Sequence, residues 1–126
     1  MQKCDPKFKT NLAERCYKFG LKVIFLTDKL PNKRSAWVIG DQVMRSATSI
    51  GANIVEARAA SSRLEFKKFY EISLKSANET KYWLELRKDA GLADKNMINA
   101  LSDEVTQLAN MIAASVIKLK SKRINF

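Results

Sequence analysis

The apolar positions of this chain recur with helical spacing along almost its whole length. Four segments follow the pattern, at about residues 9–30, 35–59, 62–90 and 94–122. In the first, apolar side chains repeat at alternating steps of four and three residues, as along the buried side of a bundle helix: Leu12, Cys16, Phe19, Val23, Leu26 and Leu30. No segment shows the period of two that a half-buried strand requires. The pattern therefore predicts helices and no sheet.

Residues with strong terminal preferences stand at the ends of these segments. Ser35 is the expected N-cap of the second helix. Ser62 and Glu65 have the spacing of a capping box that opens the third helix, and Gly91 follows that helix as the residue after its C-cap. Asp94 is the expected cap of the fourth helix. These signals divide the chain into four helices joined by short loops.

Short loops make consecutive helices antiparallel neighbours. A length of 126 residues suits one domain with a real core, and 4 Gly and 2 Pro leave little material for a turn-rich β fold. We therefore expect an all-α fold, an antiparallel up-down-up-down four-helix bundle that forms a single domain over residues 1–126.

The second segment carries three stripes of different character. Its core stripe is Ile39, Val43, Ala47, Ile50 and Ile54. A polar ladder at steps of three and four residues lies beside it, with Glu79 of the third segment expected nearby: Gln42, Arg45, Ser49, Asn53, Glu56 and Glu79. A second apolar stripe recurs near a spacing of seven: Trp37, Met44, Gly51 and Val55. One helix thus faces more than a single core.

Buried polar groups without partners cost about 1–3 kcal/mol each, so the polar ladder must be satisfied within or between subunits. Polar residues at such positions fix register or subunit contacts in coiled coils. The second apolar stripe needs cover, and Gly40, Gly51 and Ala52 would allow a close approach. Gly20, inside the first helix, is also expected to allow close packing. We therefore predict a homo-oligomer.

The net charge of +10 favours an anionic partner, with nucleic acid ahead of a membrane surface. In an up-down bundle both termini and the loop between the second and third helices share one end. We call the cluster there the basic end: Arg58, Arg63, Lys67, Lys68, Lys118, Lys120, Lys122 and Arg123. Arg15, Lys18 and Lys22 add a basic stripe on the first helix.

Two interpretations of the basic end remain open. Lysines near the end of the fourth helix complement its dipole, which accounts for Lys118 and the cations after it. That does not account for Arg63, Lys67 and Lys68, near the start of the third helix. We therefore predict RNA or DNA binding through the basic end. The alternative is a protein–protein adaptor or structural assembly module with no nucleic-acid role.

The chain lacks the residues of most catalytic and metal sites. It has no histidine, which removes the commonest general base and nitrogen ligand, and its two cysteines, Cys4 and Cys16, form no zinc pattern. It also lacks a phosphate-binding glycine loop and a nucleophile elbow. We expect no enzymatic activity, catalytic residues, metal or cofactor. Without a signal peptide or a membrane-length apolar run, we expect a cytoplasmic protein with no membrane partner.

The polar ladder and the third helix resemble a known family, the small bacterial four-helix-bundle proteins first described as products of intervening sequences in 23S rRNA genes. The matching residues are Gln42, Arg45, Ala47, Ser49, Ile50, Asn53, Ile54, Glu56, Ser62, Glu65, Phe66, Ile72, Ser76, Glu79, Thr80, Trp83 and Leu84. Two residues depart from the pattern. Ala57 stands where the family usually has Gly, and Gly51 where relatives often have Pro, which should leave this helix less kinked.

The resemblance implies a homo-oligomer, commonly a pentameric ring of bundles, and no catalytic residues. The accessory variability proteins of diversity-generating retroelements are structural relatives of the family. They are basic proteins that associate with nucleic acid and a reverse transcriptase. By analogy alone, a reverse transcriptase is a candidate protein partner of this chain.

Overall fold

The structure, a computed structural model, describes residues 7–124 and the side chains of residues 7–120. Within this range it contains no strand and forms four helices: α1 (Asn11–Asp28), α2 (Arg34–Ala57), α3 (Arg63–Asp89) and α4 (Lys95–Ile124). The predicted all-α class and the four predicted segments are therefore confirmed. Each helix end lies within a few residues of its expected position. No helix in the described range is long and apolar enough to cross a membrane.

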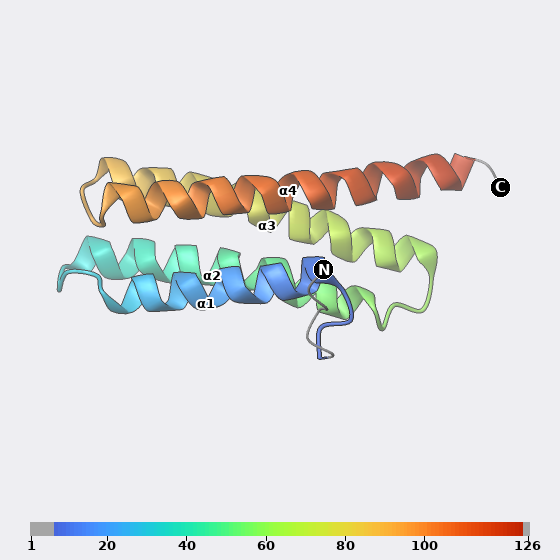
Figure 1. The fold of residues 1–126 in the computed structure, drawn as a ribbon, viewed down its shortest axis with the longest axis horizontal. Coiled ribbons are helices and arrows are strands. Elements are labelled where there is room, and N and C mark those ends of the chain that lie inside the picture. The colour runs from blue at the N-terminus through green and yellow to red at the C-terminus, as the bar shows by residue number, and fades with distance from the viewer. Residues whose placement is uncertain (1–6, 125–126) are drawn as a thin grey trace.

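The helices form a four-sided bundle in which consecutive helices run in opposite directions (Figure 1). Each helix packs on the next one in the chain and α4 packs on α1, while the Cα atoms of the diagonal pairs stay more than 8 Å apart within the described residues. Helix α1 has 18 residues, against 27 in α3 and 30 in α4. Figure 1 shows the start of α3 and the end of α4 extending past the start of α1. That end of the bundle therefore lacks a fourth helix.

Three of the four residues expected to cap a helix end do so. The Ser62 hydroxyl accepts a hydrogen bond from the Glu65 N–H at 3.1 Å, although the Glu65 carboxylate returns to Ser61 instead of completing the capping box. The Asp94 carboxylate accepts from the N–H groups that open α4, at 2.8 and 3.1 Å. Gly91 has a φ of +70°, the left-handed conformation that ends α3.

The expected N-cap at Ser35 is wrong. Helix α2 begins at Arg34, and Lys33 occupies the N-cap position without a side-chain hydrogen bond. The Lys33 N–H donates to the Pro31 carbonyl at 2.8 Å, and this turn directs the chain into the helix before Ser35 is reached. A propensity for serine at N-caps could not show this turn.

The core follows the predicted apolar stripes where all four helices are present. Its fully buried members include Phe19, Val23, Val43, Ala47, Ile50, Leu84, Ile98, Val105, Leu108 and Ile112. Near the start of α3, Phe66, Phe69 and Tyr70 are only half-buried. Figure 1 shows α3 beginning beyond the start of α1, so the first turns of α3 lack the cover of a fourth helix, although Tyr70 packs against the core. The short first helix therefore shortens the core.

The glycines pack differently from the prediction. A Cβ atom on Gly40 would lie 2.6 Å from Leu30 Cδ1, and one on Gly51 would lie 3.1 Å from Cys16 Cβ. Within this chain, Gly51 thus allows α2 to approach α1, and Gly40 leaves room for the Leu30 side chain that follows α1. Within the chain, Gly20 makes no close packing contact, because a Cβ atom there would meet no atom within 4 Å.

Candidate functional site

The polar ladder of α2 faces α3, and its inner rungs are satisfied within the chain. The Ser49 and Ser76 hydroxyls lie 2.8 Å apart, and the Asn53 amide donates to the Ser49 carbonyl at 2.8 Å and to its hydroxyl at 3.0 Å. One layer further along, the Thr80 hydroxyl lies 2.9 Å from the Ser46 hydroxyl and 2.7 Å from the Ser76 carbonyl. These groups need no partner subunit.

The outer rungs form a charged cluster on the surface. The Arg45 guanidinium donates to the Gln42 amide oxygen at 2.8 Å and pairs with the Glu79 carboxylate. The Trp83 indole N–H also donates to Glu79, at 2.8 Å. This bond, followed by Arg45, lowers the pKa of Glu79 below its ordinary value of 4.5. A carboxylate held ionised by two donors is poorly suited to be a general base.

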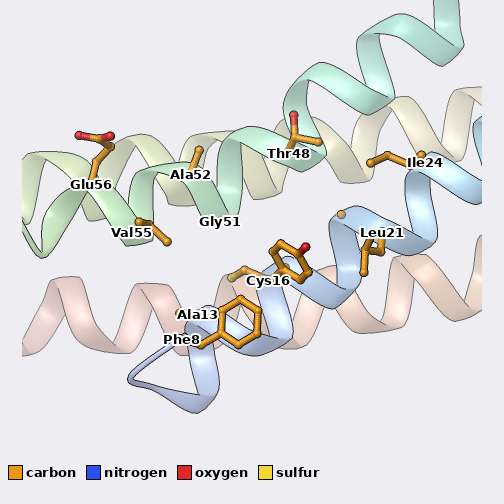
Figure 2. Close-up of a pocket in the computed structure, with 12 residues that line it drawn as sticks. Phe8, Ala13, Cys16, Leu21, Ile24, Thr48, Gly51, Ala52, Val55 and Glu56 are labelled. Carbon is orange, nitrogen blue, oxygen red and sulfur yellow. The ribbon is translucent and has the colours of Figure 1, made fainter. Parts of the chain in front are cut away.

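Glu56 was expected in the polar ladder, but it joins none of the ladder's hydrogen bonds. Its carboxylate makes no hydrogen bond or ion pair with any residue from 7 to 120, and Figure 2 shows it directed away from α1. The antiparallel register pairs Arg45 with Glu79 and Ser49 with Ser76. Continued to the level of Glu56, this register reaches Phe69, an aromatic residue.

The basic end brings the start of α3 next to the end of α4. Arg63 and Lys67 line a depression of about 120 Å³ together with Leu119 of α4. Lys68, Lys118 and Lys120 are exposed, as is Arg58 at the end of α2. Lys122 and Arg123 carry side chains outside the described residues. Six of the eight residues assigned to the basic end are therefore placed, on the end of the bundle that α1 does not reach (Figure 1).

The helix-dipole argument applies to only part of the basic end. Arg63 is the first residue of α3, but Lys67 and Lys68 lie in its second turn. The field of the helix terminus fades within the first turn, so it opposes Arg63 alone.

The expected basic stripe on α1 is largely neutralised. The Arg15 guanidinium binds both Glu104 carboxylate oxygens, at 2.7 and 3.2 Å, which raises the pKa of Arg15. Lys18 pairs with Glu14 at 2.9 Å. These ion pairs leave the basic end as the stronger concentration of positive charge.

An apolar groove of about 490 Å³ runs between α1 and α2 on the outer surface (Figure 2). We call it the α1–α2 groove. Its lining comes from the loop before α1 and from both helices: Phe8, Ala13, Cys16, Tyr17, Gly20, Leu21, Ile24, Thr48, Gly51, Ala52, Val55 and Glu56. Burial raises the pKa of the Cys16 thiol to about 12, so this cysteine is an apolar part of the lining and not a nucleophile.

The apolar pattern of the sequence predicted only the α2 wall of this groove. The second apolar stripe of α2 supplies Gly51 and Val55, as expected for a surface that needs cover. Its other wall comes from Tyr17, Leu21 and Ile24 of α1. Their spacing of four and three residues was the available signal, but the core stripe of the same helix has the same period.

The sequence patterns also did not predict the buried charge of Arg87. Arg87 is fully buried, and its Nη2 donates to the Leu26 carbonyl at 3.1 Å, while Nε and Nη1 have no partner among the described residues. Burial lowers the pKa of this guanidinium. Its contact is with the end of α1, where the carbonyl groups carry partial negative charge.

Residues 7–120 hold no cluster of three or more side chains suited to a metal ion. Comparison with known proteins adds a family. A model of the family described as 23S rRNA-intervening sequence protein matches residues 9–114. A crystal structure of a protein of unknown function from the S23 ribosomal protein family of Bacteroides thetaiotaomicron VPI-5482 has 32% sequence identity and a TM-score of 0.78, over 83% of this chain and 97% of that chain. No curated protein matches.

Proposed function

This chain belongs to the 23S rRNA-intervening sequence protein family, and we propose that it acts without catalysis, as a self-associating bundle that binds RNA or DNA through its basic end. The family membership supports the fold and leaves the activity open. The proposal therefore depends on the surfaces of this chain.

The observation that carries nucleic-acid binding is the meeting of two basic segments at the basic end. Arg63 and Lys67 of α3 line one depression with Leu119 of α4, and exposed lysines precede and follow Leu119. Phosphates of a nucleic-acid backbone bind such clusters and release counterions. Recognition of this kind follows charge and shape, so the proposal includes no base sequence.

Self-association is supported by apolar surface that the bundle leaves exposed. Tyr17, Phe25 and Trp37 are each about half exposed or more, at 48, 61 and 57%. Large exposed apolar patches on soluble proteins mark interaction surfaces. The same observation supports the second candidate function, an adaptor whose partner is another protein, such as a reverse transcriptase.

Nucleic-acid binding is tested by fluorescence anisotropy with labelled RNA and DNA of unrelated sequences. Reversing Arg63, Lys67 and Lys68 to Glu should weaken binding roughly tenfold or more and make the dependence on salt between 50 and 200 mM shallower, by about 0.7–0.9 for each phosphate that is no longer bound. The matched control reverses Lys29, Lys33 and Arg34, which stand at the opposite end and carry the same charge. Equal affinities for the two triple variants would contradict binding through the basic end.

A further inference from the structure

The basic end carries apolar and aromatic side chains among its cations. The first turns of α3, residues 63–70, have the sequence Arg-Leu-Glu-Phe-Lys-Lys-Phe-Tyr. Leu64 is 48% exposed, and Phe66 and Tyr70 are only half-buried. These turns lie where α1 does not provide a fourth helix (Figure 1). Apolar surface is therefore exposed within the cluster of positive charge.

Phe66 and Tyr70 form a stacked pair of rings beside several cations. Their ring centroids are 4.7 Å apart and their planes differ by 21°. Steps of three and four residues place Arg63 and Lys67 on the same face of α3 as this pair. Burial raises the pKa of the Tyr70 phenol, and the positive charge of Arg58 opposes that rise, so the end of α2 also brings a cation near the rings. Aromatic rings and cations of two helices thus lie together.

The depression at the basic end combines apolar and cationic groups in the same way. It has a volume of about 120 Å³, and two leucines and two cations line it: Arg63, Leu64, Lys67 and Leu119. Among residues 7–120, the lining includes no carboxylate and no neutral hydrogen-bonding side chain. A ligand that suits this depression has a flat apolar face next to a negative charge. An unpaired nucleobase with its phosphate has both, and such bases stack on aromatic rings and guanidinium planes.

We infer that the basic end binds single-stranded nucleic acid in preference to a duplex, with unpaired bases against Leu64 and the ring of Phe66 and the neighbouring phosphates on Arg63 and Lys67. The inference rests on the nucleic-acid binding in the proposed function and names its substrate class. In a duplex the base faces are covered by the neighbouring bases, so only phosphates and groove edges reach a protein surface. A single strand can place base faces on apolar side chains and phosphates on cations at once, without a base sequence being read.

A lipid surface is the other anionic partner with an apolar part, and the shape of the basic end favours nucleic acid over it. Helices that bind membranes insert apolar side chains that project beside their cations. Leu64 and Leu119 instead line a depression, and Phe66 is half-buried. This surface is built to receive a flat group, not to insert into a bilayer.

Fluorescence anisotropy tests the inference with a labelled single strand, its duplex and a single strand of the same length whose bases are replaced by abasic sites. Charge alone would favour the duplex, which has the higher phosphate density. We expect the intact single strand to bind about tenfold tighter than either other probe, because each stacked base adds to the affinity. The dependence on salt should be the same for the intact and the abasic strand, since their phosphates are equal in number. Each strand is offered as RNA and as DNA, and a preference of this kind in either one supports the inference.

Variants of the apolar side chains locate the base contact. Leu64→Ser should reduce the preference for the single strand about fivefold, because the base loses its apolar surface while the cations remain. Phe66→Leu keeps an apolar side chain without the ring and should reduce the preference in the same direction. Leu86→Ser, at an exposed leucine near the other end of α3, is the matched control and should keep the wild-type preference.

Three outcomes would contradict the inference in different ways. Equal affinities for the intact and the abasic strand, or a duplex that binds more tightly than the single strand, would overturn the single-strand preference while nucleic-acid binding stands. A chain that binds none of the probes would overturn nucleic-acid binding itself. Vesicles of phosphatidylcholine and phosphatidylserine give the remaining comparison. If Leu64→Ser weakens binding to these vesicles and not to the single strand, the apolar surface serves a membrane and the inference is wrong.

Discussion

Helix α2 meets α3 with hydroxyl and amide groups, whereas it meets α1 with apolar groups and glycine. On the α3 side, Ser49, Asn53 and Ser46 have hydrogen-bond partners in the same chain. On the α1 side, Gly40 and Gly51 let the helices approach, and the outer edge of the contact opens into the α1–α2 groove. Helix α2 therefore makes a hydrogen-bonded contact with α3, and a contact with α1 whose outer edge remains open as a groove.

The difference assigns separate roles to the two sides. A buried hydrogen-bonded network tolerates one register only, because a shift of one helical turn would leave its polar groups unpaired. The α3 side therefore fixes how the chain folds. An apolar groove tolerates more than one arrangement and gains free energy from whatever covers it. The α1 side is therefore where an additional copy is expected.

The largest expected contrast comes from one substitution made on each side. Thr80→Ala removes a fully buried hydroxyl with two hydrogen-bond partners and should lower the free energy of unfolding by about 2 kcal/mol. Thr48→Ala, at the α1–α2 groove, removes an exposed hydroxyl that bonds its own helix and should change it by less than about 0.5 kcal/mol. Urea denaturation measures both. Equal losses would contradict the contrast between the two sides.

A smaller loss is expected at Asn53. Its amide bonds only Ser49 of the same helix, one turn away, so Asn53→Ala should lower the free energy of unfolding by about 1 kcal/mol. Its mass by light scattering should equal that of the wild type. A variant that dissociates without losing stability would place the polar ladder at a subunit contact after all.

The two glycines that face the α1–α2 contact should respond with opposite signs. Gly20→Ala should raise the free energy of unfolding of the dissociated chain by about 0.5–1 kcal/mol, because it improves helix propensity and meets no atom within 4 Å. Gly51→Ala should lower it, because the new Cβ would lie 3.1 Å from Cys16 Cβ and force the helices apart. Thermal unfolding of both variants measures these changes. A higher stability of Gly51→Ala than of the wild type would contradict the close approach of α1 and α2 at Gly51.

The smallest effect concerns pH at the surface of the polar ladder. The pKa of Glu79 is lowered by Trp83 and Arg45, so the ionised form stabilises the fold above the ordinary pKa of 4.5. That contribution should be lost as the pH falls below 4.5 and through the lowered pKa. The difference in unfolding free energy between the wild type and Glu79→Gln should therefore be larger at pH 7 than in acid. A difference independent of pH would mean that Glu79 is not held ionised.

The sequence was sufficient for the helices and most of their packing, because apolar spacing follows directly from helix geometry. The capping by Ser62, Gly91 and Asp94 was readable for the same reason, since each acts on its own neighbours. The start of α2 could not be predicted in this way, because the turn at Pro31 changes where the helix begins.

What could not be predicted depends on which helices meet at each level. Glu56 has the same spacing as Ser49 and Asn53, but it makes no hydrogen bond or ion pair with residues 7–120. Burial of Arg87 against the Leu26 carbonyl joins residues distant in sequence, which no local pattern shows. Self-association, nucleic-acid binding and the lack of enzymatic activity remain predictions.

The most direct test of the open side of α2 is photo-crosslinking from position 21, on the wall of the α1–α2 groove. Leu21 is replaced by a photoreactive amino acid in isotopically light chains, which are mixed with heavy chains so that mass spectrometry separates crosslinks between copies from those within one. We predict crosslinks from light position 21 to heavy chains, because the α1–α2 groove is the side of α2 where a second copy is expected. Crosslinks within one copy alone, with none between copies, would contradict the account.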